Sequence, residues 1–316
     1  MSEPAPEARL WDCLRGALAT RALATVAELR VAEALADGPR RVEDLARESG
    51  ADADTLHRLL RALASDGIFA EDTPGVFRNT DASDLLRDGG WDDFARLFGG
   101  VWYRTVERLD ASGTPVFEPA FGADFWTWLG ENPHERAAFD RAMGQGGEGR
   151  IERLAALEWR GDETVVDVGG GNGSLLTGLL ALQPRLRGIV LDLPETNRDD
   201  AALGERIAFV PGSFFEQVPP GDVYVLSTIL HDWDDDRAAA ILRTIRAGAP
   251  PGARVLLIEA VVEPGNERDG AKWLDLLMLA LFGGRERDET QWRALLEGAG
   301  LRVDEISDGL IQAICP

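Results

Sequence analysis

The chain of 316 residues contains few of the residue types that build disulfides and metal sites. Its two cysteines, Cys13 and Cys315, lie at opposite ends of the chain, so their spacing indicates neither a disulfide framework nor a zinc site. Histidine is also scarce, with three residues in all. We therefore expect a protein that works without a bound metal.

Long hydrophobic runs and an excess of basic charge are absent too. No stretch approaches the roughly 18 apolar residues of a membrane-spanning helix, and the first residues lack the pattern of a signal peptide. The 33 basic and 55 acidic side chains give a net charge of −22, which disfavours nucleic acid as a partner because its phosphates need a basic surface. We expect a soluble, cytoplasmic protein that binds neither membranes nor nucleic acid.

Residues 1–90 are expected to form a winged-helix-like domain. Their apolar residues recur at helical spacing, and residues 23–37 predict a helix that ends at Gly38 and Pro39. Two short apolar runs around a Pro-Gly turn follow as a hairpin. Winged helices often bind DNA, but in so acidic a chain we expect a dimerisation domain.

The rest of the chain divides into a helical region and an alternating one. Residues 91–160 stay helical in period and are rich in aromatic side chains, so we expect a linker that contributes to a substrate pocket. Residues 161–316 alternate between short β-rich runs and helices, with five such runs and then two final strands. This alternation predicts an α/β domain whose mostly parallel sheet is covered by helices on both faces.

The first strand of this domain, VVDV, runs into the glycine-rich turn GGGNGS and then a helix. Glycines let a ligand approach the backbone, and a helix N-terminus offers free N–H groups. Ser174 stands where a dinucleotide motif needs Gly or Ala, which disfavours an NAD-dependent oxidoreductase. Asp167 precedes the glycines, and Asp192 ends the next strand, where an acid can bind a ribose. Together these residues predict a cofactor that contains adenosine.

His231 follows the strand DVYVLS, at the edge of the sheet where ligands bind in such folds. An imidazole with an ordinary pKa of about 6.5 can take a proton from a hydroxyl near neutral pH. His57 and His134 lie elsewhere and are expected to be structural. The acidic run that includes Asp234 is explained by a helix N-terminus, so we do not expect a magnesium site.

Several stretches resemble, in order and spacing, the small-molecule O-methyltransferases that use S-adenosylmethionine (SAM): VVDVGGGNGS, IVLDLPE, ILHDWDDD, IEAVVEP and FGGRERDETQWRALLEGAGL. This group includes plant caffeate-type enzymes and bacterial natural-product enzymes such as the anthracycline methyltransferases. The resemblance implies a Rossmann-like, seven-stranded class I methyltransferase sheet and an all-helical or winged-helix dimerisation domain that forms an intertwined homodimer. It also implies SAM as co-substrate and a small aromatic acceptor, a phenolic or polycyclic natural product methylated on a hydroxyl.

The resemblance further implies roles for individual residues. His231 takes the position of the catalytic base, and Glu259 and Glu286 those of the two acids beside it. The expected cofactor-binding residues are Gly169, Gly171, Asp192, Ser213, Phe214 and Ser227. Of these, Ser213 replaces the usual Asp near the adenine, and Ser227 falls where plant relatives have Lys. The expected substrate-binding residues are Met143, Trp102, Trp126, Met278 and Phe282, for each of which core packing is the rival interpretation.

Other functions stay open at this point. A relative that binds SAM for hydroxylation or a pericyclic reaction is expected to lose the base, whereas this chain keeps His231 and both acids. The acceptor atom could be nitrogen or a carboxylate instead of a hydroxyl. A winged-helix regulator that senses SAM is disfavoured by the acidic charge. The identity of the acceptor and the effect of Ser213 on adenine binding are likewise open.

Overall fold

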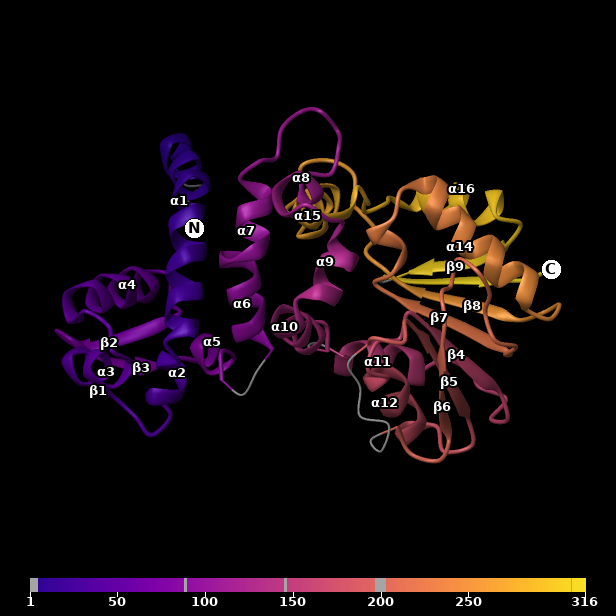
Figure 1. Cartoon of the computed structure of the whole chain (residues 1–316), viewed down its shortest axis with the longest axis horizontal. Helices are drawn as coiled ribbons and strands as arrows, with labels where there is room; N and C mark the ends of the chain where they lie inside the picture. Colours follow the sequence, from indigo (N-terminus) through magenta and orange to yellow (C-terminus); the bar gives the residue numbers. More distant parts are fainter. Residues whose placement is uncertain (1–4, 88–89, 145–146, 197–202, 308) are drawn as a thin grey trace. The chain divides into compact units, whose positions relative to one another are not determined.

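The computed structural model describes residues 5–87, 90–144, 147–196, 203–307 and 309–316. The chain divides into two compact units, coloured by sequence in Figure 1. Unit 1 comprises Met1–Glu107 and His134–Gln145, and unit 2 comprises Arg108–Pro133 and Gly146–Pro316. Among the described residues, helices that are both long and apolar enough to cross a membrane are absent.

Unit 1 is mainly helical and contains a small antiparallel sheet in the order β1-β3-β2. Its helices and strands are α1 (Pro6–Glu28), α2 (Val31–Ala34), β1 (Arg40–Arg41), α3 (Val42–Ser49), α4 (Ala53–Ser65), β2 (Phe69–Thr73), β3 (Val76–Asn79), α5 (Asp81–Asp84), α6 (Trp91–Gly99), α7 (Val101–Val106) and α10 (Pro133–Met143). Apolar side chains of α1, α3, α4 and the hairpin share one core, to which Leu56, Leu60 and Phe77 belong. The predicted helices followed by a hairpin are confirmed.

The single helix predicted over residues 23–37 is wrong, because the backbone turns at Arg30. This residue has φ 54°, in the left-handed region that side chains other than glycine rarely adopt. The turn ends α1 at Glu28 and lets α2 begin at Val31. Val26 and Val31 lie on either side of this turn and are buried in the same core. The spacing of apolar residues therefore continues across the turn and does not show that the helix is interrupted.

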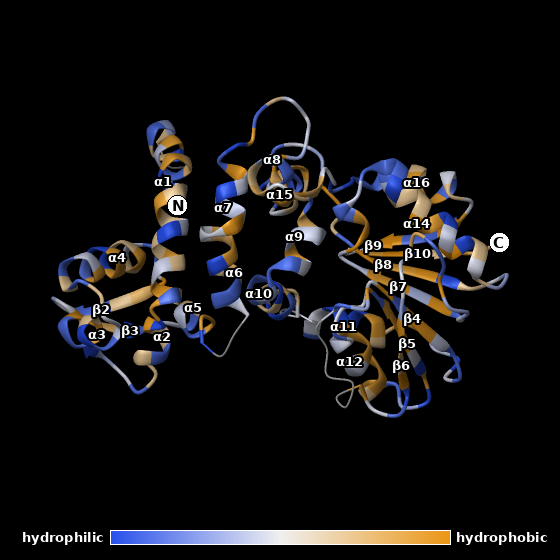
Figure 2. Cartoon of the chain, in the orientation of Figure 1, coloured by the Kyte–Doolittle hydropathy of each residue, from blue (hydrophilic) through white to orange (hydrophobic). Residues whose placement is uncertain are grey.

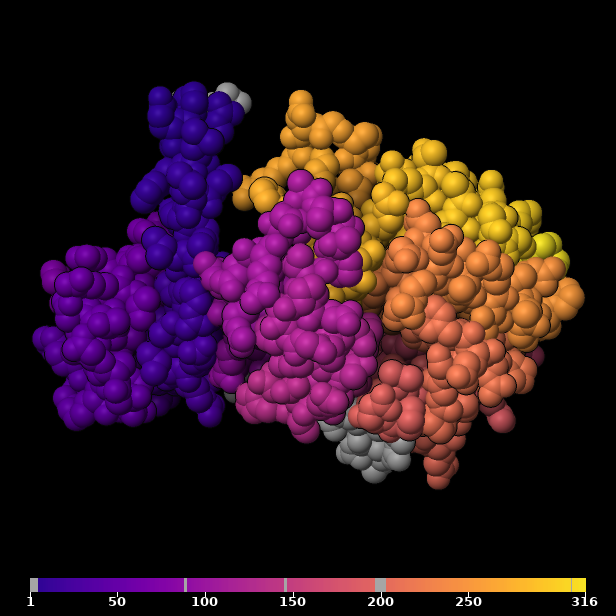
Figure 3. All heavy atoms as spheres, turned by 45° about the horizontal axis from the view of Figure 1, so that its top comes forward, coloured from indigo at the N-terminus to yellow at the C-terminus, as the bar shows by residue number. Residues whose placement is uncertain are grey.

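The first turns of α1 project from the rest of unit 1 (Figures 1 and 3). They carry a stripe of four apolar side chains that are 61–73% exposed, namely Leu10, Trp11, Leu14 and Leu18. A continuous exposed stripe of this kind typically marks a surface that another protein covers.

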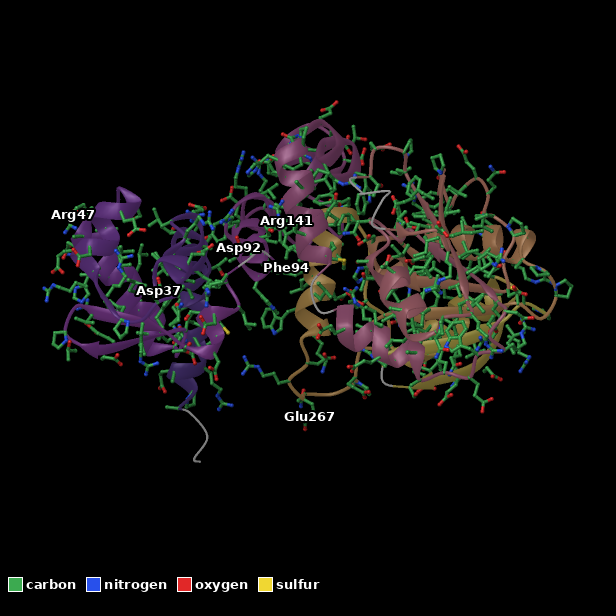
Figure 4. The ribbon with its side chains drawn as sticks, turned by 90° about the horizontal axis from the view of Figure 1, so that it is seen from below. Asp37, Arg47, Asp92, Phe94, Arg141 and Glu267 are labelled. Atoms are coloured by element: carbon green, nitrogen blue, oxygen red, sulfur yellow. The ribbon has the colours of Figure 1, made fainter. Side chains whose placement is uncertain are left out.

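Within unit 1, α10 is joined to α6 by a charged pair. Two nitrogens of Arg141 donate to the two carboxylate oxygens of the buried Asp93, at 2.7 and 2.9 Å. Figure 4 labels Arg141 near Asp92, the neighbour of Asp93 in the sequence. Asp92 is also buried, and burial raises the pKa of its carboxyl group. This bidentate geometry fixes the orientation of the two helices more firmly than a single hydrogen bond does.

Unit 2 holds a seven-stranded sheet in the order β6-β5-β4-β7-β8-β10-β9, which confirms the predicted number of strands. The first five are parallel, while β10 runs antiparallel to both β8 and β9. The helices and strands are α8 (Phe117–Phe121), α9 (Phe125–Glu131), α11 (Gly147–Ala155), β4 (Thr164–Val168), α12 (Ser174–Leu182), β5 (Arg187–Asp192), β6 (Ile207–Pro211), β7 (Val223–Ser227), η1 (Leu230–Asp232), α14 (Asp235–Gly248), β8 (Arg254–Ile258), α15 (Ala271–Phe282), α16 (Glu289–Gly298), β9 (Arg302–Ser307) and β10 (Leu310–Ile314).

Helices cover both faces of the hydrophobic strands, as Figure 2 shows. On one face, residues such as Val166 and Tyr224 pack with the buried sides of α14 and α16. On the other, Val165 and Val225 pack with α12 and with Leu154 of α11. Neighbours along a strand thus point to opposite faces, which is the alternation expected of a sheet buried on both sides.

Candidate active site

Three neighbouring parallel strands present polar side chains toward the same face at their carboxyl ends. Asp192 in β5, Asp167 in β4 and Ser227 in β7 each come two residues after a valine that is buried on the α11 side. Because side chains alternate along a strand, these polar groups point to that side as well. The carboxyl ends of parallel strands are where α/β sheets bind ligands.

Asp192 holds the glycine-rich turn after β4 in place. The backbone N–H of Gly171 donates to its Oδ2 at 2.7 Å, and its Oδ1 accepts from Leu193 N and Thr196 Oγ1, also at 2.7 Å. Gly171 has φ 58° and open space where a side chain would project. The turn therefore has a fixed shape and an exposed backbone against which a ligand can lie.

Gly169 joins this turn to the residues that follow β6 and β7. It has φ 72°, and a side chain there would approach the Cδ1 of Ile229 to 2.6 Å and the ring of Phe214 to 3.4 Å. Phe214 is half-buried and packs against Phe215 and Trp233. Phe214 thus borders the glycine turn, and its contact with a cofactor stays a prediction.

The other two polar residues predicted to contact the cofactor have partners within the chain. Ser213 Oγ accepts from the backbone N–H of Phe215 at 3.2 Å and closes the turn after β6. Ser227 Oγ accepts from Nη1 of Arg150 at 3.2 Å. Arg150 belongs to none of the motifs recognised in the sequence, although its position four residues before the buried Leu154 places it on the sheet-facing side of α11.

The turn η1 (Leu230–Asp232) places His231 among three carboxyl groups. Its Nδ1 lies 2.7 Å from Oε1 of Glu286 and 3.8 Å from Oε2 of Glu259, and its Nε2 lies 3.5 Å from Oδ1 of Asp232. All four side chains are buried. The structure therefore brings together the three residues expected to be catalytic and adds Asp232.

Backbone N–H groups take part in the hydrogen bonds that position both glutamates. Oε1 of Glu259, just after β8, accepts from the N–H groups of Ile229 and Leu230 at 2.9 and 2.7 Å. Glu286 lies in the loop after α15, and its own N–H donates to Asp275 at 2.8 Å. Both acids thus have fixed positions relative to the imidazole.

The charges around His231 strongly change its affinity for a proton. Burial lowers its pKa, but the charges of Glu259 and Asp232 and the hydrogen bond and charge of Glu286 outweigh burial and raise the pKa to about 10. Burial in turn raises the pKa of Asp232 to about 7 and also raises that of Glu259. The expectation of an ordinary imidazole pKa is wrong, because acids from separate parts of the chain meet the ring.

Arg287, which is not among the predicted site residues, fixes the loop that carries His231. Its fully buried guanidinium donates to the carbonyl oxygens of Leu230 and Trp233 at 3.1 and 2.9 Å and to Asp235 at 2.9 Å. It also lies 5.1 Å from the centroid of the Trp292 ring. An arginine in a charged stretch gives no local sign that it is buried.

The same loop meets η1 through its backbone. The backbone N–H of Arg285 donates to the carbonyl oxygen of His231 at 2.8 Å. Any side chain at Gly284 would collide with that carbonyl group. A residue without a side chain is therefore required for the loop after α15 to bring Glu286 to the imidazole.

Metal binding is the alternative chemistry for this cluster. One potential ligand atom from each of His231, Glu259 and Glu286 lies within 4.8 Å of the others. However, Nδ1 of His231 is bonded to Glu286, and Glu259 accepts two backbone hydrogen bonds. In the nearby acidic run, Asp234 accepts from the N–H of Arg237 at 2.8 Å and caps α14. That a metal is not needed stays a prediction.

The residues expected to contact the acceptor fall into both units. In unit 2, the rings of Trp126 and Phe282 stack at 5.5 Å with an interplanar angle of 17°, and the buried Met278 lies one helical turn before Phe282. In unit 1, Trp102 is buried against Phe94 and Phe98, and half-buried Met143 ends α10. Within unit 2 the structure brings Trp126, Met278 and Phe282 together, and a substrate role for all five residues stays a prediction.

Two family models match the chain. The model of the O-methyltransferase domain matches residues 102–302, and that of the O-methyltransferase dimerisation domain matches residues 11–88. The second match includes Trp11, Leu14 and Leu18 of the exposed stripe on α1. It supports the predicted homodimer.

Individual relatives agree with this match over nearly the full chain. The phenazine O-methyltransferase PhzM of Lysobacter antibioticus is 36% identical, with 94% of this chain and 91% of the relative covered. The 2,7-dihydroxy-5-methyl-1-naphthoate 7-O-methyltransferase of Streptomyces carzinostaticus is 40% identical, with 89% of each chain covered.

Among solved structures, the O-methyltransferase NcsB1 from neocarzinostatin biosynthesis, in complex with S-adenosyl-L-homocysteine and 1,4-dihydroxy-2-naphthoic acid, is 36% identical. Its TM-score is 0.78, and the alignment covers 94% of this chain and 96% of that one. With the seven-stranded sheet, the glycine turn and the matched dimerisation domain, these similarities establish that the chain belongs to the family of SAM-dependent O-methyltransferases.

Proposed function

We propose that this O-methyltransferase methylates a hydroxyl of a phenolic or polycyclic aromatic natural product, with His231 as general base. The observation that carries the proposal is the buried imidazole held by Glu286 at 2.7 Å, two residues from the Ile229 side chain that borders the glycine turn. When bound, SAM supplies a methyl group on a positively charged sulfur.

The residues along the sheet edge fit SAM. A carboxylate accepts about four hydrogen bonds, and Asp192 has three donors in the described part of the chain, so it has capacity for a ribose hydroxyl. Gly171 leaves open space beside it, and Phe214 offers an apolar surface on the side of β6. We assign Gly169, Gly171, Asp192 and Phe214 to the cofactor. We do not assign Ser213 to the cofactor, because its Oγ already accepts the hydrogen bond from the N–H of Phe215.

The hydrogen bonds of His231 define its part in the reaction. With Nδ1–H donating to Glu286, Nε2 is the nitrogen that accepts the proton of the acceptor hydroxyl. The oxygen forms a bond to the methyl carbon, and the electron pair of the breaking carbon–sulfur bond stays on sulfur. The positive charge then rests on the imidazole, where Glu259, Glu286 and Asp232 stabilise it.

The raised pKa of His231 is compatible with this role. Alone with its three acids, the imidazole is protonated near neutral pH. A sulfonium bound nearby adds a second positive charge, and a like charge lowers the pKa of the ring. When SAM is bound, its charge would thus shift His231 toward the neutral form, which is the form that accepts the hydroxyl proton.

An aromatic acceptor is supported by the stacked rings of Trp126 and Phe282 and by Met278 beside them. Stacked aromatic side chains favour flat ligands. The relatives named above act on phenazines and dihydroxynaphthoates, which are flat as well. The predicted cytoplasmic location remains untested.

The proposal is tested with SAM labelled in its methyl group. We expect label to enter hydroxylated naphthoates or phenazines, and their O-methylated counterparts to remain unlabelled. Amino and carboxyl analogues of the same ring systems serve as competitors. Label that enters only nitrogen or carboxylate contradicts the proposed acceptor, and hydroxylated product without label contradicts methyl transfer.

Replacing Asp192 by alanine is expected to weaken binding of SAM about 10- to 100-fold, because a charged hydrogen-bond acceptor is lost and the glycine turn is released. Calorimetry with S-adenosylhomocysteine measures the change. Glu195→Ala, an exposed acid three residues away, is the matched control and should bind normally. Equal affinity of the Asp192 variant and this control would remove the ribose assignment.

Replacing Glu259 by glutamine is expected to shift the pH profile of methyl transfer to lower pH. The Glu259 charge is the largest contribution that raises the pKa of His231, and glutamine still accepts from the N–H groups of Ile229 and Leu230. Because the base must be unprotonated, the rate rises as the pH passes through this pKa, which is lower in the variant. The measurement is kcat/KM for the acceptor against pH, with exposed Glu263→Gln as control. Superimposable profiles contradict the assignment.

A further inference from the structure

A residue in an unfavourable backbone conformation lies between β7 and the turn η1 that carries His231. Thr228 has φ 54°, in the left-handed region, where a β-branched residue is rare. Among the described residues other than glycine, only Arg30 shares a positive φ. Strain of this kind persists only where the surrounding structure imposes it, and it is concentrated at functional sites. Its place three residues before His231 therefore indicates a functional reason for the strain.

The conformation of Thr228 changes the direction in which successive N–H groups point. In an extended strand, neighbouring N–H groups point to opposite sides. Here the N–H of Thr228 donates to the carbonyl oxygen of Ile258 at 2.9 Å. The next two N–H groups, of Ile229 and Leu230, donate to Oε1 of Glu259 at 2.9 and 2.7 Å. Three consecutive donors thus reach two consecutive residues at the end of β8, which an extended Thr228 would not allow.

The two N–H groups that reach Glu259 line a small concavity. Neighbouring residues of opposite hand form such a concavity, and it binds anions. Thr228 is the left-handed member, and Ile229, with φ −114° and ψ −50°, is the right-handed one. The anion that it holds is the carboxylate of Glu259, which is 3% exposed. The same turn places the side chain of Ile229 beside Gly169 of the glycine turn.

The hydroxyl of Thr228 supports its own backbone conformation. Oγ1 donates to the carbonyl oxygen of Ser227 at 2.7 Å, so the side chain is bonded to the peptide group directly before it. A short polar side chain that bonds to the local backbone offsets part of the cost of a left-handed conformation. Valine has nearly the same shape but cannot form this bond, whereas glycine adopts a left-handed conformation without one.

We propose that Thr228 is a positioning residue for methyl transfer, because its left-handed backbone directs two N–H groups onto Glu259 and so fixes the acid beside His231. The proposal rests on the proposed function, in which His231 is the general base. Oε2 of the same glutamate lies 3.8 Å from Nδ1 of the imidazole. Thr228 acts through these two residues and needs no contact with either substrate. Misplacing a reacting group by about 1 Å can lower a rate about 100-fold.

Two substitutions separate the backbone of this residue from its side chain. Thr228→Val should lower kcat about 10- to 100-fold, because the left-handed turn loses its hydrogen bond and the base is misplaced. Thr228→Gly should keep kcat close to that of the wild type. Calorimetry with S-adenosylhomocysteine counts the binding sites, and kcat is expressed per site so that unfolded protein is not included.

The control for the loss of a hydroxyl is Thr244→Val. Thr244 is half-buried in α14, and its Oγ1 donates to the carbonyl oxygen of Ala240 at 3.1 Å. This variant should have the kcat of the wild type. Normal kcat for Thr228→Val overturns the proposal. A Thr228→Gly enzyme as slow as Thr228→Val, or slower, also overturns it, because the side chain would then matter more than the backbone.

A double variant tests whether Thr228 acts through His231. In the His231→Ala enzyme, adding Thr228→Val should cause little further loss of kcat, because the base that Thr228 positions is already absent. A further loss as large as in the wild type means that Thr228 acts independently of His231, and it contradicts the proposal. Normal kcat for His231→Ala alone contradicts the proposed function itself, so the two failures are distinguishable.

Discussion

Replacing His231 by alanine is expected to lower kcat for methyl transfer about 10²–10⁴-fold, the usual loss when a general base is removed. Affinity for SAM should stay close to that of the wild type, because the cofactor residues lie on the strand ends and the glycine turn. The measurement is the rate of label transfer at saturating SAM, with the affinity for S-adenosylhomocysteine measured in parallel.

Two further variants separate chemistry from folding. His231→Asn retains a group that can donate to Glu286 at the position of Nδ1, so it should fold like the wild type yet remain slow. His134→Ala, which changes an exposed histidine, should have full activity. A His231→Ala enzyme with normal kcat would mean that the acceptor arrives already ionised and that the protein only positions the partners.

Replacing Arg287 by methionine is expected to lower the free energy of unfolding by about 2–5 kcal/mol, because the carbonyl oxygens of Leu230 and Trp233 lose their donor in a buried place. Chemical denaturation measures this change. Since both carbonyl groups flank His231, we also expect kcat to fall more than the affinity for S-adenosylhomocysteine does.

The neighbouring arginine provides the control for this experiment. Arg285 forms an ion pair with the same Asp235 at 3.0 Å, but its side chain is 46% exposed. An exposed pair contributes about 1 kcal/mol or less, so Arg285→Met should unfold nearly like the wild type. If the two variants lose equal stability, the buried hydrogen bonds of Arg287 are not what holds the loop.

The sequence is most informative where local rules decide the structure. The strand VVDV, the glycine turn and the acid at the end of the next strand are neighbours or near neighbours, and alternation along strands then determines the face to which Asp167 and Asp192 point. The seven strands could be predicted for the same reason.

Contacts between segments that are far apart in the sequence cannot be predicted from these local rules. The burial of Arg287 depends on Leu230 and Trp233, and the raised pKa of His231 depends on acids that follow β8 and α15. The left-handed turn at Arg30 is hidden for another reason, because apolar spacing continues through it. Arg150 lies between these cases, since its helix face is predictable but its partner Ser227 is not.

The three acids around His231 have a consequence for the whole catalytic cycle. In the proposed reaction, one unit of positive charge enters on sulfur and leaves on the imidazole, so the total charge facing these acids is equal before and after methyl transfer. The polar groups of the protein around the site can therefore keep their orientation while the oxygen–carbon bond forms and the carbon–sulfur bond breaks. The imidazole keeps this proton after the products leave, as in the enzyme without substrates, and a single proton passes from the ring to solvent when SAM and the acceptor next bind.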